Sequence, residues 1–216
     1  MKIEGCEYPD SFLYDVDAGT WVNKEGSEYK IGIAPHLGWI SGGFTSVAFK
    51  NVGAHVEMGK GLGSVEGPRH FDVVRAPFDC VIEGVNSRLA SDPKLANKDP
   101  FGAGWFALLK QTGPASRLLT WAEAMSPVTA TVKRLGVRCF AEFPDIEMFE
   151  IGTECSAVLV KLNEIMEKSH QGTVVHIVSD DPTSEIEMVR WEHQTGNRLI
   201  ESRAEERLHH FIVKKR

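Results

Sequence analysis

The run Asn97-Lys98-Asp99-Pro100-Phe101-Gly102-Ala103-Gly104-Trp105 closes the stretch of sequence that decides the fold. Upstream of it, short apolar and β-branched runs alternate with glycines. The clearest of these runs are 29–33 (YKIGI), 46–49 (SVAF), 71–74 (FDVV) and 81–85 (VIEGV). Short strands separated by turn signals roughly every ten residues are typical of a β-sandwich or a β-barrel. Residues 10–110 are therefore predicted to form a mainly β domain.

Residues 31–105 resemble, without a gap, the H-protein of the glycine cleavage system. The most specific part of the resemblance is the closing pattern Asn-x-Asp-Pro-Phe-Gly-x-Gly-Trp. The motifs that carry it are Ile31-Gly32-Ile33, Val52-Gly53, Val65-Glu66-Gly67, Ala76-Pro77, Val85-Asn86, Asp92-Pro93, Leu95, Asn97 and the run from Asp99 to Trp105. The resemblance implies a flattened, barrel-like β-sandwich that carries lipoate on the tip of a hairpin.

The lysine to which that family attaches lipoate is replaced in this sequence. In the family pattern, Val-Glu-Ser is followed by an apolar residue and then by the lipoylated lysine, whereas here Val65-Glu66-Gly67 is followed by Pro68 and Arg69. A guanidinium has a pKa above ~12 and stays protonated, so it cannot replace the neutral amine that lipoylation needs. We therefore expect no lipoate and no other cofactor. Pro68, Arg69 and His70 form either an ordinary solvated turn or a polar tip that docks a partner or an anionic ligand.

The last third of the chain has a different pattern. A strand at 146–151 precedes an amphipathic helix at 155–168, whose apolar face carries Val158, Leu162 and Met166. A second strand follows at 173–178, and a second helix is expected to start at Asp180-Asp181-Pro182 and to end before Gly196. Two strands close the chain, so residues 144–216 are predicted to form a two-layer β-α-β-α-β-β domain.

Residues 146–214 are similar to the TusA family of sulfur-carrier proteins. The similarity is carried by Gly152-Thr153-Glu154-Cys155, by Gly172 and by Ser179-Asp180-Asp181-Pro182. It implies that Cys155 accepts sulfur as a persulfide and passes it to the next protein. Both prolines that follow the family cysteine are absent, because Ser156 and Val158 stand in their places.

The chemistry expected of Cys155 follows from its place at the start of a helix. Unpaired N–H groups and the helix dipole lower the pKa of a thiol there, whereas the carboxylate of Glu154 raises it. The two effects are similar in size, so we expect a thiol of nearly ordinary pKa. Because it lies in a connection, it is also expected to be at least partly exposed. The alternative is a retained but inert cysteine.

Cys139 is a second candidate thiol. Gly136-Val137-Arg138-Cys139 repeats the Gly-x-x-Cys spacing, but no amphipathic helix follows it. We expect a buried or linker thiol, able to resolve a disulfide on Cys155 if the two Cα atoms come within ~7 Å. It lies in residues 111–143, which are predicted to be a linker with a short helix that ends before Pro127.

Composition excludes several classes of function. The chain has 216 residues, with 24 Lys and Arg against 30 Asp and Glu, so its net charge of −6 disfavours nucleic-acid binding. No apolar run approaches the ~20 residues that span a bilayer. The N-terminus lacks the apolar region of a secretory signal, and four scattered cysteines do not suggest a disulfide framework, so a cytoplasmic location is expected. Neither C-x-x-C nor H-E-x-x-H occurs, and no metal site is predicted.

Two carrier-type patterns in one chain favour a protein that relays sulfane sulfur through Cys155. The first domain would dock a partner protein of sulfur or lipoate metabolism. The alternative is an inert adaptor or regulator of a lipoate- or sulfur-handling complex, because the lysine and the prolines are both lost. A free-standing enzyme is less favoured, since no set of nucleophile, base and oxyanion donors is visible. Any activity would resemble that of a sulfurtransferase.

Overall fold

The structure is a computed structural model that describes residues 1–115 and 118–216. It divides into two compact units, Met1–Cys139 and Phe140–Arg216. The boundary therefore lies close to the predicted start of the second domain at residue 144. It lies far from the predicted end of the first domain at residue 110, because the residues up to Cys139 also belong to the first unit.

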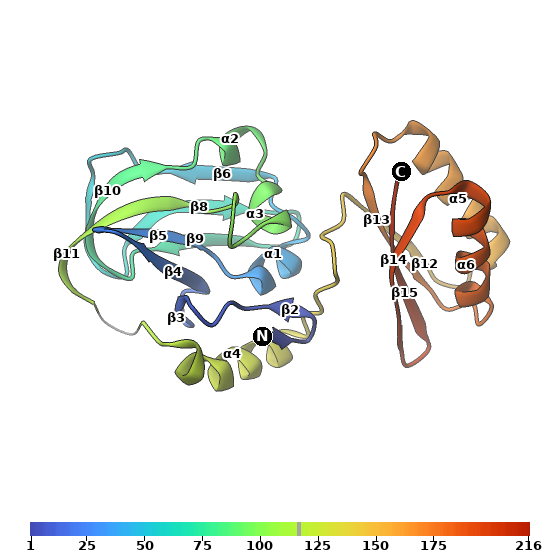
Figure 1. Cartoon of the computed structure of the whole chain (residues 1–216), viewed down its shortest axis with the longest axis horizontal. Helices are drawn as coiled ribbons and strands as arrows, with labels where there is room; N and C mark the ends of the chain where they lie inside the picture. The colour runs from blue at the N-terminus through green and yellow to red at the C-terminus, as the bar shows by residue number, and fades with distance from the viewer. Residues whose placement is uncertain (116–117) are drawn as a thin grey trace. The chain divides into compact units, whose positions relative to one another are not determined.

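Two β-sheets dominate the first unit (Figure 1). The larger sheet has the order β3-β4-β5-β11-β10-β7, and the smaller has the order β6-β8-β9. The strands of these two sheets are β3 (Leu13–Asp15), β4 (Thr20–Glu25), β5 (Glu28–Ile33), β6 (Ser46–Phe49), β7 (His55–Val56), β8 (Gly61–Glu66), β9 (Phe71–Arg75), β10 (Phe78–Val85) and β11 (Ala107–Ala115). Three short helices, α1 (Pro35–Ser41), α2 (Arg88–Ser91) and α3 (Leu95–Lys98), lie in the connections. This β-rich unit confirms the predicted fold class of the N-terminal part.

The main core of the first unit is formed by apolar side chains from both sheets. Alternate residues of each strand point to this core, as expected for strands with one buried face. Members from the larger sheet include Val22, Ile31, Phe78, Ile82 and Leu109, and members from the smaller sheet include Leu62, Val65 and Val74. The resulting packing fixes the β8–β9 hairpin on the unit.

A second core of the first unit forms under α4 (Trp121–Leu135). The ring of Trp121 stacks on that of Tyr8 at 5.1 Å between centroids, and Ala124, Val128 and Val132 continue the buried face of the helix. The prediction of a linker with a short helix over 111–143 is therefore wrong in most of its length. Helix α4 runs through Pro127, because its packed face continues on both sides of that residue. Ser116 and Arg117, also in the predicted linker, lie outside the described residues.

Cys6 and Cys139 form a disulfide across 133 positions of sequence. Cys6 belongs to β2 (Cys6–Glu7), which pairs with β1 (Lys2–Ile3). The backbone N–H of Cys139 also donates to the carbonyl of Glu4 at 2.9 Å. The expectation that the scattered cysteines form no disulfide is therefore wrong, and Cys139, although buried as expected, is not a free second thiol. The spacing of the cysteines in the sequence did not reveal this disulfide, because only the folded first unit brings Cys6 and Cys139 together.

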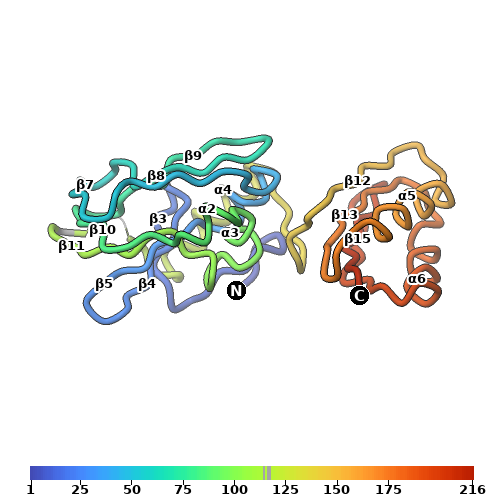
Figure 2. The backbone as a smooth tube through the Cα atoms, turned by 90° about the horizontal axis from the view of Figure 1, so that it is seen from above, coloured from blue at the N-terminus to red at the C-terminus, as the bar shows by residue number. Residues whose placement is uncertain are grey.

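The second unit confirms the predicted order of elements. It contains β12 (Ile146–Glu150), α5 (Cys155–Lys168), β13 (Val174–Ser179), α6 (Ser184–Thr195), β14 (Arg198–Glu205) and β15 (Leu208–Lys214). The sheet order is β12-β13-β15-β14, with β12 parallel to β13 and the other pairs antiparallel. Helices α5 and α6 cover one face of this sheet (Figures 1 and 2). The core between these layers includes Leu162, Val175, Trp191 and Phe211.

Helix α6 begins two residues later than predicted. Its first residue is Ser184 rather than Pro182. The carboxylate of Asp181 instead accepts hydrogen bonds from the backbone N–H and the hydroxyl of Thr183, each at 2.7 Å. Asp181 thus organises the loop before the helix.

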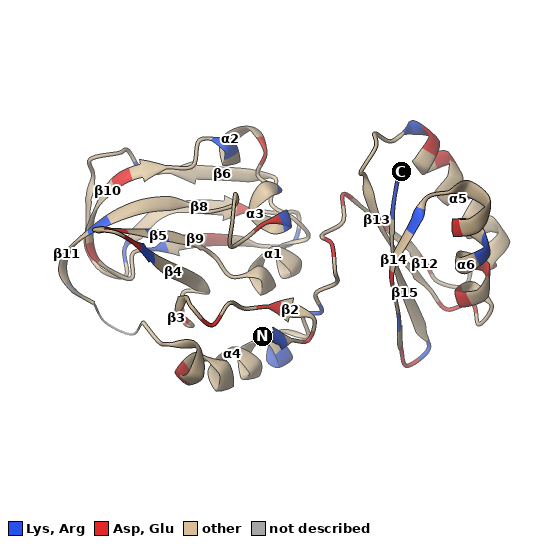
Figure 3. Ribbon diagram, viewed as in Figure 1, with Lys and Arg blue, Asp and Glu red and all other residues tan. Residues whose placement is uncertain are grey.

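The surface of the described residues carries charges of both signs on both units (Figure 3). Within the described part of the chain, no helix is long and apolar enough to cross a membrane.

Candidate functional site

The β8–β9 hairpin ends in the turn of Gly67, Pro68, Arg69 and His70. The backbone N–H of Gly67 donates to the carbonyl of His70 at 2.9 Å and closes the turn. Pro68, Arg69 and His70 are all exposed. The three residues singled out from the sequence therefore lie together at an accessible tip.

The tip packs against the end of α1 and the residues that follow it. The backbone N–H of Arg69 donates to the carbonyl of Ser41 at 3.2 Å. A Cβ atom on Gly67 would come within 2.5 Å of the carbonyl oxygen of Ser41 and 2.6 Å of that of Gly43. Only a glycine fits this approach without movement of the backbone. The turn is thus held in place by the unit rather than projecting freely.

The guanidinium of Arg69 lies over the same end of α1. Its Nη2 atom donates to the carbonyl of Trp39 at 3.4 Å, and a Cβ atom on Gly42 would lie 2.7 Å from its Nε atom. Carbonyls at a helix C-terminus attract cations. The side chain of Arg69 is therefore a cation that binds its own fold, and a guanidinium does not fit an amide-linked lipoyl group.

A cavity of about 250 Å³ opens beside the tip, within the first unit. Its lining comes from four segments: the β3–β4 turn, α1, the start of β9 and the last turns of α4. Polar members of this lining are Asp17, His36, His70, Asp72 and Arg134. His70 and Asp72 approach each other at 3.8 Å between Nε2 and Oδ2. The sequence pointed only to the segment that holds His70, because the other three segments are distant along the chain.

His36 is the most buried polar group of this cavity, with 3% of its surface exposed. Its Nδ1 atom lies 2.9 Å from the hydroxyl of Tyr8. Burial lowers the pKa of His36 to about 4, so the imidazole is neutral near pH 7. No sequence signal marks this residue, since a lone histidine after a proline carries no motif.

Cys155, the second candidate site, is the first residue of α5. Its backbone N–H donates to Oδ2 of Asp181 at 2.8 Å, and only 5% of its surface is exposed. Burial, together with the charges of Asp181 and Glu187, raises the pKa of the thiol to about 11. The expectation of a partly exposed thiol of ordinary pKa is therefore wrong. The acidic neighbours come from the loop before α6 and from α6, which a reading of local sequence does not place beside Cys155.

The candidate residues belong to different units. Cys139 is held in the disulfide of the first unit, whereas Cys155 belongs to the second. Among the described residues, no group of three or more His, Cys, Asp or Glu side chains is arranged to hold a metal ion. The hairpin tip with its cavity is the feature that combines exposure, charge and a space for a ligand.

Comparisons with known proteins concern the first unit. Residues 13–130 match the model of the family described as glycine cleavage H-protein. The chain is 30% identical over 145 residues to glycine cleavage system H protein 5 of Aquifex aeolicus, covering 64% of this chain and 98% of that protein. It is 32% identical over 115 residues to the H protein of Herpetosiphon aurantiacus, covering 53% and 88%.

A solved structure shows the same likeness. The crystal structure of a glycine cleavage system H protein from Mycobacterium marinum superposes with a TM-score of 0.51 and 27% sequence identity. The match covers 55% of this chain and 97% of that one. It therefore supports the fold of the first unit.

Proposed function

The chain belongs to the glycine cleavage H-protein family through residues 13–130, and from this membership we propose that its first unit is a docking module that carries no lipoyl arm. The second unit would be presented to the same partner. The whole chain then acts as an adaptor or regulator of a protein complex that handles lipoate or sulfur, and not as a carrier of lipoate.

One observation carries this proposal. Arg69 stands where the resemblance of the sequence expects the attachment lysine, and its guanidinium is bound to the carbonyl of Trp39. A guanidinium has no neutral amine to offer for acylation. The rest of the tip is still suited to contact a partner, because Pro68 and His70 are exposed and Phe71 next to them has 58% of its surface exposed.

The experiment is an attempt to lipoylate the full chain. Incubation with a lipoate ligase, lipoate and ATP should leave the intact mass unchanged, while a lipoylatable H-protein treated in parallel gains one lipoyl group. The informative variants are Arg69→Lys and Pro68→Val/Arg69→Lys, which restore the amine without and with an apolar residue before it. We expect at least the double variant to gain one lipoyl group, because the hairpin turn is otherwise intact.

Two results would contradict the proposal. A lipoyl adduct on the wild-type chain at any residue would show that another lysine serves as the attachment site. Lys60 is the nearest lysine before the tip, so Lys60→Arg is the matched control that identifies such a substitute. The absence of lipoylation in both tip variants would instead show that the loss of Lys at position 69 does not explain the result by itself.

Sulfur relay through Cys155 is the second candidate function. It is supported by the resemblance to TusA-like carriers and by the position of the thiol at the start of a 14-residue helix. It is opposed by the burial of the thiol and by its pKa of about 11, since the thiolate is the form that accepts sulfur. We therefore rank this candidate below the adaptor.

A further inference from the structure

The four residues 140–143 at the start of the second unit lie on the sheet face opposite to α5 and α6, and we call them the strap. The helix-facing side of the sheet is defined by Val175, Ile177, Phe211 and Val213. Because side chains alternate along a strand, His176 on β13 and His210 on β15 point to the other face. The strap covers these two histidines.

Phe140 forms the centre of this contact. Its ring lies 4.7 Å from that of His176 and 5.4 Å from that of His210, measured between centroids. The guanidinium of Arg203 lies 4.4 Å from the centre of the same ring, at the distance of a cation–π contact. The aromatic ring therefore packs against both imidazoles and one guanidinium.

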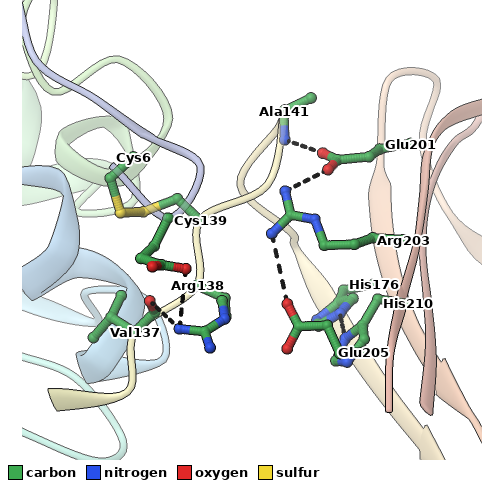
Figure 4. A network of polar contacts seen from close by, with 11 residues as sticks. Cys6, Val137, Arg138, Cys139, Ala141, His176, Glu201, Arg203, Glu205 and His210 are labelled. Carbon is green, nitrogen blue, oxygen red and sulfur yellow. Dashed lines mark hydrogen bonds and ion pairs between the residues drawn. A yellow bond between two sulfur atoms is a disulfide. The ribbon is translucent and has the colours of Figure 1, made fainter. Parts of the chain in front are cut away.

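Polar contacts hold the residues that follow Phe140. The backbone N–H of Ala141 donates to Oε2 of Glu201 at 2.7 Å, and Nζ of Lys214 donates to Oε2 of Glu142 at 2.7 Å. Glu201 also accepts from Arg203 at 2.5 Å (Figure 4). The contacts of the Phe140 ring and the polar contacts of Ala141 and Glu142 thus attach the strap within the second unit, and Phe143 at its end is buried.

The two histidines are joined directly. Nε2 of His176 lies 3.1 Å from Nδ1 of His210 (Figure 4). One of these nitrogens has to accept the hydrogen bond, so the contact exists with the pair neutral or singly protonated and is lost when both rings are imidazolium. The side chain of His176 is 7% exposed, and two adjacent cations in such a place repel each other strongly.

The groups around the histidine pair carry charges of both signs. Those on the face of the pair or in its strap are Glu147 on β12, Glu201, Arg203 and Glu205 on β14, and the Glu142–Lys214 ion pair. His209 on β15 points to the other face, where it lies 3.4 Å from Glu185 of α6. Oε1 of Glu147 lies 3.9 Å from Nδ1 of His176. Burial lowers the pKa of His210, as do His176, Arg203 and His209, while Glu205 opposes the shift. The neutral form of His210 is thus the one that the folded unit favours.

We propose that the His176–His210 pair is an acid-sensitive latch that holds the strap on the sheet and releases it when both imidazoles are protonated. Release has two consequences. It uncovers an aromatic strip that continues to Phe149, whose ring lies 6.3 Å from that of His176. It also lengthens the connection after Cys139 by four residues, or up to ~14 Å of extended chain.

The sign of the pH dependence follows from His210, whose pKa is lowered in the folded unit. A group whose pKa is lowered by folding contributes stability above its ordinary pKa, near 6.5, and that contribution is lost as the pH falls. The strap is therefore expected to stay bound at about pH 7.5 and to leave as the solution is acidified toward about pH 5.

The test is an NMR titration of the full chain over that range. The amide signal of Ala141 reports on the strap, the imidazole signals report on each histidine, and the methyl signals of Leu162 and Val213 report on the core. In the wild type, we expect the Ala141 signal to move toward its position in Phe140→Ala, which serves as the reference for a released strap. The core methyl signals should not change.

Two variants make the test specific. His210→Gln keeps a hydrogen-bonding partner for His176 but cannot become a second cation, so its Ala141 signal should stay in the bound position at about pH 5. His176→Gln is the equivalent variant if the first does not fold. His193→Gln removes an exposed histidine of α6 and should titrate like the wild type.

Three outcomes would overturn the proposal. The Ala141 signal does not move although both imidazoles become protonated, or it moves equally in the glutamine variants, or the core methyl signals disappear together with it. In the last case acid unfolds the whole unit, and the strap is not a separate element.

Discussion

At the scale of single residues, Arg69 and Cys155 differ in how much of their chemistry can be predicted from the residue type. The loss of the acylation chemistry at Arg69 follows from the identity of the residue, because a guanidinium is protonated in any environment. The reactivity of Cys155 depends on its surroundings instead. Glu154 next to it is not among the causes of its raised pKa, whereas Asp181 and Glu187 are. Those residues are brought to the thiol by the fold, so the sequence alone led to the wrong pKa.

This difference predicts how Cys155 reacts. Alkylation of the folded wild type should be slow near pH 8, because the thiol is buried and its pKa is about 11. Asp181→Asn keeps an oxygen for the backbone N–H of Cys155 but removes a charge, so it should accelerate alkylation by up to about tenfold. Glu154→Gln is the matched control and should react like the wild type.

Mass spectrometry of the same samples locates the product. Cys155→Ser separates its signal from that of Cys80, the other unpaired cysteine among the described residues. Treatment of the wild type with a persulfide donor should leave Cys155 unmodified. A persulfide on Cys155, or rapid alkylation with an apparent pKa near the ordinary ~8.5, would restore sulfur relay as the favoured function.

At the scale of elements, the periodicity of apolar residues predicted a helix best where that helix packs against a single sheet. The face of α5 at Val158, Leu162 and Met166 was predicted correctly and is buried, because a helix on a sheet needs one continuous apolar stripe. The length of α4 was underestimated because of a single residue. Pro127 lacks an N–H and was interpreted as the end of a helix, but burial on both sides of it offsets the lost hydrogen bond.

The start of α4 predicts a measurable contribution to stability. The carboxylate of Glu123 accepts hydrogen bonds from the backbone N–H and the hydroxyl of Thr120, at 2.9 and 2.7 Å. Thr120→Ala should destabilise the first unit by about 1 kcal/mol. Denaturant unfolding followed by tryptophan fluorescence measures this, since Trp191 is the only tryptophan outside that unit. Ser126→Ala, on an exposed turn of the same helix, should have little effect.

The destabilisation caused by Thr120→Ala is expected to depend on pH. Hydrogen bonds from Thr120 lower the pKa of Glu123, so their contribution is present above the ordinary glutamate pKa of about 4.3 and is lost as the pH falls through the lowered value. The stability difference between wild type and Thr120→Ala should shrink in acid. A difference that is constant from about pH 7 to about pH 3 would show that Glu123 is not part of the cap.

At the scale of the whole molecule, the two units were recognisable because their patterns differ, β-rich with many glycines in the first and alternating strands and helices in the second. The extent of the first unit was not recognisable. Its second core joins the N-terminal segment, at Cys6, Tyr8 and Tyr14, to a helix more than a hundred residues later. Such contacts have no local signature, and the disulfide between Cys6 and Cys139 belongs to the same long-range set.

Fragments of the chain test this division. Residues 1–139 contain both cores of the first unit and both cysteines of the disulfide, so this fragment should fold and melt cooperatively. Residues 1–115 lack α4, which exposes Tyr8 and Tyr14 where they contact Trp121, and they lack the disulfide, whose removal typically costs about 2–5 kcal/mol. We expect the shorter fragment to lose near-ultraviolet circular dichroism and cooperative melting. Cys139→Ser in the 1–139 fragment separates the two causes, because it removes the disulfide and keeps α4. If residues 1–115 melt at the same temperature as residues 1–139, the second core does not stabilise the unit, and residues 111–143 behave as the linker that the sequence alone suggested.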